Sequence, residues 1–440
     1  MSGAVSARRR REVIEALRRG TVPANGLDLL AVGLDRFAPT VGDELDRAAG
    51  GSSAFKAVRG DYGSGKTFFT RWVAERARRR GMATAEIQIS ETETPLHRLE
   101  TVYRRIAESL TTASFPPSAL RSVLDAWLYT LAEDAAAAPQ ESAAVDDPVG
   151  RLLERRLAGV ATNTPVFAQA LRAYHRAMAT DDLALAEGLL AWLSGQPQVA
   201  ASVKRQAGIR GELDHFGALG FLQGMLTVLR DSGHPGLLVV LDEVETLQRV
   251  RGDVRDKALN ALRQLVDEID SGRFPGLYLM ITGTPAFFDG PSGVPRLPPL
   301  AARLSTDFGG DPRFDNPRAV QIRLPGFDRP HLTELGRRVR DLYVMDASPR
   351  VATVVDDAYL QVLADAVAGP FGGKVGVVPR LYLKKLVVEV LDKVDLFGDF
   401  DPRRDYSLTV GEAELTPVEQ AARAGSAASV DDVPLDLPSP

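Results

Sequence analysis

The stretch with the clearest chemical potential is a glycine-rich segment at residues 60–67, Gly-Asp-Tyr-Gly-Ser-Gly-Lys-Thr. It follows an apolar run at residues 54–58 and precedes residues 68–74, whose apolar positions have helical spacing. A loop in this position directs backbone N–H groups and a helix N-terminus at one anionic volume, and side chains at its glycines would obstruct that approach. The order of strand, glycine loop and helix therefore predicts a phosphate-binding loop.

Some residues of the loop are expected to bind phosphate, and one is expected to bind a metal ion. Lys66 is expected to reach the β- and γ-phosphates of ATP, and Thr67 to ligate Mg²⁺. The residues expected to contact the nucleotide are Gly60, Asp61, Tyr62, Gly63, Ser64, Gly65, Lys66, Thr67 and Phe68. The competing interpretation is a glycine-rich turn with a solvated lysine, and the flanking strand and helix count against it.

A pair of acidic residues supplies the second half of the expected site. Asp242 and Glu243 end the apolar run at residues 236–243, and open α/β sheets hold their ligands at the carboxyl ends of strands. Asp242 can hold Mg²⁺ through water, and Glu243 can orient or deprotonate the water that attacks the γ-phosphate. Glu245 is interpreted as supporting charge. An acidic pair at a strand end also has a purely structural interpretation, which the nearby Lys66 and Thr67 weaken.

Two further residues are candidates for contact with the nucleotide. Thr282 ends another apolar run, at residues 276–283, where its hydroxyl can stand between the water and the γ-phosphate as a sensor. A threonine at a strand end is equally common without such a role. Arg380 begins the last predicted helix, from which it can reach a nucleotide that lies between two domains.

The elements that must position these residues follow from hydrophobic periodicity. Strands are predicted at residues 54–58, 83–90, 236–243, 276–283 and 319–324. Helices are predicted at residues 8–19, 41–49, 67–80, 255–269, 332–343, 356–367 and 381–394, with further helices between residues 96 and 223. The continuous apolar runs are typical of strands buried on both faces. The sequence therefore predicts an α/β P-loop NTPase fold with a five-stranded, mostly parallel sheet.

Changes of pattern along the chain divide it into units. These are an N-terminal helical arm at 1–53, a P-loop core at 54–95 and 231–325, a large helical insertion at 96–230, a C-terminal helical lid at 326–397 and a mostly disordered tail at 398–440. The arm can cover the adenine ring of the nucleotide, or it can have a purely structural role in packing against the rest of the protein. Five aromatic residues are expected to fill a helical core within the insertion: Tyr103, Trp127, Phe167, Tyr174 and Trp192.

Composition narrows the chemistry further. The chain of 440 residues has no cysteine, which excludes disulfides, thiolate zinc sites and cysteine nucleophiles. Its histidines lack metal-ligand spacing, so the expected metal is an oxygen-liganded one such as Mg²⁺. The net charge of −5 argues against a uniformly basic nucleic-acid surface, although DNA stays a candidate ligand. The first residues lack the apolar core of a signal peptide and no run is long enough to span a membrane, so a soluble cytoplasmic protein is expected.

The order of these elements resembles that of the additional-strand ATPases, and the helical C-terminal unit makes it AAA+-like. The resemblance implies the strand order 5-1-4-3-2. It also implies an arginine that acts in trans between the fourth and fifth strands, for which Arg303 is the preferred candidate, with Arg296, Arg313 and Arg318 in the same connection. Thr67 and Asp242 are separated by 175 positions, far more than the class needs, so we expect an inserted unit of about a hundred residues that meets a partner.

A more specific resemblance rests on three segments. These are residues 18–23, Arg-Arg-Gly-Thr-Val-Pro; residues 31–33, Ala-Val-Gly; and residues 58–69, which contain the glycine loop. They resemble the ATP-binding protein of BREX phage-defence systems, the BrxD-like group, over residues 8–395. The resemblance implies a bacterial cytoplasmic ATPase that acts with a helicase or methyltransferase against foreign DNA. A homo-oligomer formed with ATP is a separate expectation.

Two other functions stay open at this point. One is a nucleotide-dependent scaffold or switch with little turnover. The other is a DNA-loading ATPase of the origin-recognition type, which the absence of a clear winged-helix pattern after Pro325 makes less favoured.

Overall fold

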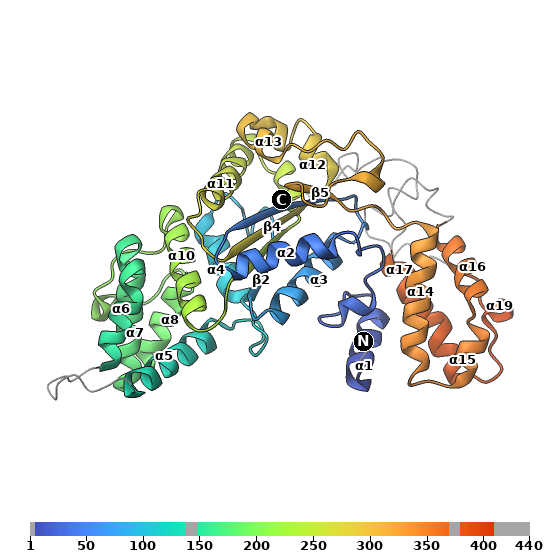
Figure 1. Cartoon of the computed structure of the whole chain (residues 1–440), viewed down its shortest axis with the longest axis horizontal. Coiled ribbons are helices and arrows are strands. Elements are labelled where there is room, and N and C mark those ends of the chain that lie inside the picture. The colour runs from blue at the N-terminus through green and yellow to red at the C-terminus, as the bar shows by residue number, and fades with distance from the viewer. Residues whose placement is uncertain (1–4, 138–147, 369–378, 409–440) are drawn as a thin grey trace, which may run out of the picture.

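The computed structural model describes residues 5–137, 148–368 and 379–408, and a five-stranded sheet lies at its centre (Figure 1). The strands are β1 (Ala54–Arg59), β2 (Ala83–Gln88), β3 (Leu237–Asp242), β4 (Leu277–Gly283) and β5 (Gln321–Arg323). Their order is β2-β3-β4-β1-β5, and all pairings within this sheet are parallel. The five-stranded parallel sheet predicted from sequence is confirmed, and its order, read from β5, is the 5-1-4-3-2 that the AAA+ resemblance implies.

The sheet brings the ends of three strands together. β1 lies beside β4 with Arg59 opposite Gly283, and β3 lies on the other side of β4 with Leu241 opposite Ile281. Because the strands are parallel, their carboxyl ends share one edge, where the glycine loop leaves β1. β3 and β4 are buried along their whole length, which explains their unbroken apolar sequence.

Helices cover both faces of the sheet. On one face, α2 (Ala38–Ala49) and α3 (Lys66–Arg79) enclose a core that includes Val58, Val240 and Met280. The other face packs against α11 (Gly252–Asp270) and the helices that lie between β2 and β3. The connection from β4 to β5 contains α12 (Pro285–Asp289), η3 (Val294–Arg296), α13 (Pro298–Leu304) and η4 (Pro312–Phe314).

The segment between β2 and β3 is helical and extends to one side of the sheet (Figure 1). It contains α4 (Leu99–Ser109), α5 (Leu120–Ala137), α6 (Pro148–Asn163), α7 (Pro165–Ala179), α8 (Leu183–Leu193), α9 (Ala201–Ala207) and α10 (His215–Asp231). Tyr103, Phe167 and Trp192 each place a ring within 5.0–5.6 Å of the Phe221 ring, measured between centroids. These three residues, with Trp127 and Tyr174, are buried as the sequence predicted.

A second helical group follows β5 on the opposite side. It comprises α14 (Arg329–Val344), α15 (Pro349–Val354), α16 (Asp357–Ala368), α17 (Pro379–Lys384), a π-helical segment (Lys385–Leu391) and α18 (Asp392–Leu396). We call this group the lid. Residues beyond the predicted end of the lid also belong to it, because Phe400, Tyr406 and Leu408 pack against its core and flank α19 (Pro402–Asp405). The rest of the predicted tail, residues 409–440, lies outside the described residues.

The N-terminal segment divides between the two cores. Val13 and Leu17 of α1 (Ala7–Arg18) pack with lid residues such as Leu386. In contrast, Leu27 of η1 (Leu27–Leu29) and Val41 of α2 belong to the core on the α3 face of the sheet. The segment therefore connects the lid to the sheet. Among the residues that the structure describes, no helix is both long and apolar enough to cross a membrane.

Candidate nucleotide-binding site

The glycine loop is tightly folded against itself. A Cβ at Gly60 would lie 2.3 Å from Ser64 Oγ, so this position has no room for a side chain. Gly65 has φ +89°, a left-handed conformation that glycine adopts without steric cost, and α3 begins at the next residue. The Ser64 hydroxyl is buried without a hydrogen-bond partner. Glycine at these positions lets the loop turn directly from β1 into the N-terminus of α3.

Lys66 is buried inside the curve of the loop. Its Nζ donates to Gly60 O at 2.8 Å and Asp61 O at 3.3 Å, and it lies 5.1 Å from the centre of the Tyr62 ring. The nearest carboxylate oxygen is Glu245 Oε1 at 3.9 Å. The lysine side chain is 8% exposed. The hydrogen-bond acceptors of the Lys66 ammonium group are thus neutral backbone carbonyls, which an anionic ligand can replace because hydrogen bonds between charged groups are stronger.

Thr67 and Asp242 meet across the end of the sheet. Thr67 Oγ1 donates to Asp242 Oδ2 at 2.9 Å, although the residues come from different elements. The other carboxylate oxygen, Asp242 Oδ1, accepts from the Thr282 hydroxyl. Hydroxyl and carboxylate oxygens are ligands that Mg²⁺ prefers, and Mg²⁺ needs only one or two from the protein when phosphate and water supply the others. The pair therefore fits the expected metal.

Thr282, the residue that the sequence suggested as a sensor, is buried at the end of β4. The residue is 0% exposed. Its hydroxyl donates to Asp242 and accepts the backbone N–H of Glu243 at 3.1 Å. Both interactions point into the protein, so the geometry is that of a residue that orients the acidic pair.

Glu243 turns the chain at the end of β3. It has φ +60°, which is uncommon for a residue with a side chain. Its Oε2 accepts a hydrogen bond from Gln88 Nε2, at the end of β2, at 2.8 Å. Sequence reasoning missed Gln88, although applying the strand-end rule to β2 as well as to β3 and β4 would have found it.

Glu245 is the most unusual carboxylate of the site. It lies on η2 (Val244–Gln248), is 4% exposed, and neither of its side-chain oxygens has a hydrogen-bond partner. Burial raises the pKa of its carboxyl to about 7, against the opposing effect of Lys66. From the sequence, Glu245 was interpreted only as supporting charge near the acidic pair. Its burial could not be predicted, because it depends on how η2 packs.

A cavity of about 410 Å³ lies between the sheet and the lid, and we call it the P-loop cavity. Its loop end consists of Asp61, Tyr62, Gly63, Gly65, Lys66, Thr67, Asp242, Glu243 and Glu245. The remaining wall, the lid end, consists of Leu17, Gly20, Thr21, Val22, Pro23, Leu30, Phe68, Phe327, Leu335, Pro379, Arg380 and Leu383. Arg380 therefore lies on the cavity from the lid, and the lid end is mainly apolar.

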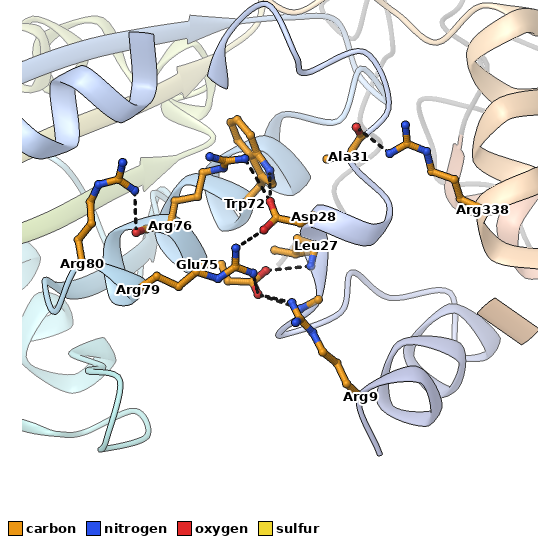
Figure 2. A network of polar contacts seen from close by, with 11 residues as sticks. Arg9, Leu27, Asp28, Ala31, Trp72, Glu75, Arg76, Arg79, Arg80 and Arg338 are labelled. Carbon is orange, nitrogen blue, oxygen red and sulfur yellow. Dashed lines mark hydrogen bonds and ion pairs between the residues drawn. The ribbon is translucent and has the colours of Figure 1, made fainter. Parts of the chain in front are cut away.

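Polar contacts to α3 hold the N-terminal segment beside this cavity (Figure 2). The Glu75 carboxylate accepts the backbone N–H groups of Gly26 at 3.1 Å and Leu27 at 2.8 Å, and it also pairs with Arg9 at 3.0 Å. Asp28 accepts from Trp72 Nε1 at 2.8 Å. Since α3 also carries Lys66 and Thr67, the same helix positions both the loop and the N-terminal segment.

Arg303 lies away from the P-loop cavity. It is at the end of α13 and forms ion pairs with two aspartates of α11, Asp267 at 2.7 Å and Asp270 at 2.6 Å. Its side chain is 43% exposed. It therefore does not contact the site of its own chain.

The fold and the site together define the class of protein. The strand order, the glycine loop after β1 and the acidic pair after β3 are those of a P-loop NTPase of the additional-strand class with an AAA+-like arrangement. The chain belongs to the family of BREX system ATP-binding proteins BrxC/D, whose model matches residues 5–410. This confirms the resemblance found in the sequence.

Two solved structures from Aeropyrum pernix have detectable similarity. The ORC1 protein in complex with DNA has 16% identity and a TM-score of 0.38, over 94% of this chain and 69% of that chain. The ORC2 protein in ADPNP–ADP complexes has 12% identity and a TM-score of 0.40, over 85% of this chain and 70% of that chain. The sequence has no significant match among curated proteins.

Proposed function

We propose that this chain is a Mg²⁺-dependent ATPase that acts in defence against phage DNA. The observation that carries the proposal is the contact of 2.9 Å between Thr67 Oγ1 and Asp242 Oδ2, beside Lys66, in one cavity. A lysine, a hydroxyl and a carboxylate in this arrangement match what phosphoryl transfer from ATP to water requires. The family supports ATP as the nucleotide.

The proposed mechanism depends on position and charge. Lys66 leaves the loop carbonyls to bind the β- and γ-phosphates, and Glu243 orients or deprotonates the attacking water. Thr67 and Asp242 hold Mg²⁺, which when bound neutralises charge on the phosphates. Thr282 positions Asp242 and Glu243, and through them it is the proposed sensor of the γ-phosphate.

Gln88 gives the proposed mechanism a resting state. Its amide holds the Glu243 carboxylate at 2.8 Å, at the outer strand of the sheet. A water-activating role for Glu243 requires this bond to break or to be shared with the water. Turnover is therefore expected to be low until a partner or ligand moves β2 or its neighbouring helices.

The remaining parts of the proposal concern other molecules. The helices between β2 and β3 are the proposed contact region for a helicase or methyltransferase of the same cytoplasmic defence system, and DNA is a candidate ligand. Arg303 is the proposed trans-acting arginine of a homo-oligomer formed with ATP, which requires it to exchange Asp267 and Asp270 for a neighbouring subunit's nucleotide. Arg380 is the proposed contact from the lid to the nucleotide.

The decisive experiment substitutes Glu243→Gln and measures ATP binding and phosphate release separately. If Glu243 activates water, the variant retains ATP while phosphate release falls about a hundredfold or more. Glu187→Gln is the matched control. Glu187 is an exposed glutamate that pairs with Arg121, and neither residue lines the cavity. Unchanged phosphate release by Glu243→Gln would contradict the assignment.

The same measurements separate the alternatives. A nucleotide-dependent scaffold or switch would bind ATP with negligible phosphate release in the wild-type chain, alone or with DNA. A DNA-loading ATPase would show DNA-stimulated turnover and DNA binding that weakens steeply as salt is raised.

A further inference from the structure

Glu245 faces the P-loop cavity with both carboxylate oxygens unbonded. The residue is 4% exposed, and Glu245 Oε1 lies 3.9 Å from Lys66 Nζ. A buried carboxylate without hydrogen bonds is unfavourable in the ionised form, and Lys66 is the only cation within ion-pair distance among the described residues. The interaction with Lys66 is therefore important to the charge state of Glu245.

The other charged groups around Glu245 do not replace Lys66. Asp242 and Glu243 from β3 are acidic, as is Asp61 of the glycine loop, which lines the same cavity. On α11, Arg255 donates to the backbone carbonyls of Leu247 and Gln248. On α12, Asp289 pairs with Arg59, and Arg380 lines the cavity from the lid. Apart from Lys66, the charges that act on Glu245 are those of Asp242 and Glu243, and both oppose its ionisation.

Binding of a nucleotide would change this balance. The phosphates compete for Lys66 and at the same time bring negative charge into the cavity that Glu245 faces. We propose that Glu245 is a counter-charge that competes with nucleotide phosphate for Lys66, and that it weakens nucleotide binding when it is ionised. This inference rests on the proposed assignment of Lys66 to the phosphates. It makes Glu245 a positioning residue that lowers affinity and so favours release of the product.

The direction of the pH dependence follows from the same charges. Burial raises the pKa of the Glu245 carboxyl to about 7 in the empty protein. A phosphate near Glu245 raises this pKa further. At a pH between the two pKa values, nucleotide binding is therefore accompanied by protonation of the Glu245 carboxylate. Relative to a chain without this carboxyl, Glu245 therefore has little effect on nucleotide affinity below pH 6 and lowers it increasingly as the pH rises from 6 to 8. A difference of one pKa unit between empty and bound protein corresponds to about a tenfold change in affinity.

The test compares Glu245→Gln with the wild-type full-length chain by calorimetry, using ADP and the β,γ-imido analogue of ATP. The glutamine has the same shape but no charge. At pH 8 the variant should bind both ligands about tenfold more tightly than wild type, and at pH 6 the two affinities should be nearly equal. The ratio of the two affinities removes the titration of the ligand's own phosphate. Each titration is repeated with Mg²⁺ and with EDTA, so that effects on the metal are measured separately.

Glu86→Gln is the matched control. Burial also raises the pKa of Glu86, but this residue pairs with Arg71 at 3.0 Å and does not line the P-loop cavity. Its substitution should change affinity by no more than about twofold, while a general effect of net charge would change both variants equally.

Several outcomes distinguish the proposals. Weaker or unchanged binding by Glu245→Gln at pH 8 would overturn the counter-charge role, and so would a ratio of variant to wild-type affinity that is the same at pH 6 and pH 8. If Lys66→Ala binds the nucleotides as well as wild type, the assignment of the loop itself fails. Calorimetry with these ligands requires no turnover, so absence of hydrolysis would affect only the proposed ATPase activity.

Discussion

The loop end and the lid end of the P-loop cavity differ in both chemistry and origin. The loop end is polar and lies at the carboxyl edge of the parallel sheet, where Thr67 and the buried Thr282 both donate to Asp242. The lid end is mainly apolar and comes from segments far apart in sequence, such as Val22 and Leu383. One end is positioned by strand pairing, and the other by the packing of helices.

The comparison explains what each end can contribute to binding. Charge-assisted hydrogen bonds are directional and strong, so the loop end can recognise phosphate and orient water. Apolar contact lacks direction, so the lid end can add affinity for a base without distinguishing ATP from ADP. Substitutions at the two ends should therefore have different consequences.

The largest effect is expected from Lys66→Ala at the loop end. Loss of a charged hydrogen-bond donor to the phosphates should weaken binding of the imido analogue about a hundredfold, measured by calorimetry. Lys204→Ala, in α9, is the control and should leave affinity unchanged. An affinity within threefold of wild type in Lys66→Ala would mean that phosphate does not bind at the loop.

A smaller effect is expected from Thr282→Val, which tests how the acidic pair is oriented. The variant removes the donor to Asp242 and one acceptor of the part-buried Glu243 N–H, which keeps Asp242 Oδ1 at 3.2 Å as its other acceptor. ATP turnover should fall about tenfold with a smaller change in affinity, measured by steady-state kinetics. Thr282→Ser keeps the hydroxyl and should restore turnover. Failure of serine to rescue would indicate that the methyl group, and hence packing, is what matters.

At the lid end, Leu383→Ala should weaken ATP-analogue and ADP binding by the same factor, about fivefold. The reason is that the leucine contributes apolar surface and no interaction with the γ-phosphate. Leu396→Ala is the control, because Leu396 is 73% exposed. A loss confined to the ATP analogue would contradict the assignment of Leu383 to the lid end.

The smallest effect on affinity is expected from Glu75→Ala, which tests the connection between the two ends. The variant leaves the N–H groups of Gly26 and Leu27 without their acceptor, at a cost of about 2–4 kcal/mol to folding. Thermal unfolding should begin several degrees lower, while ATP affinity changes by about threefold or less. Glu12→Gln is the control, since Glu12 forms an ion pair with the exposed Arg8. Loss of binding without loss of stability would show that the N-terminal segment acts directly on the nucleotide.

Local patterns were sufficient to predict much of the loop end. The glycine loop and the runs that end in Asp242 and Thr282 are contiguous in sequence, and parallel strands bring such ends to one edge. The fold class and the five strands could therefore be predicted. The state of the side chains could not, because the burial of Thr282 and the bond from Gln88 to Glu243 depend on neighbours from other strands.

The N-terminal segment shows most clearly what only the tertiary structure decided. The sequence determined that α1 and α2 are amphipathic helices ahead of a phosphate-binding loop. It did not determine that α1 packs with the lid while α2 packs with the sheet, because an apolar stripe specifies burial without specifying a partner. The same reason applies to Glu245, whose position in the sequence is adjacent to the acidic pair but whose unbonded carboxylate becomes apparent only when η2 packs beside Lys66.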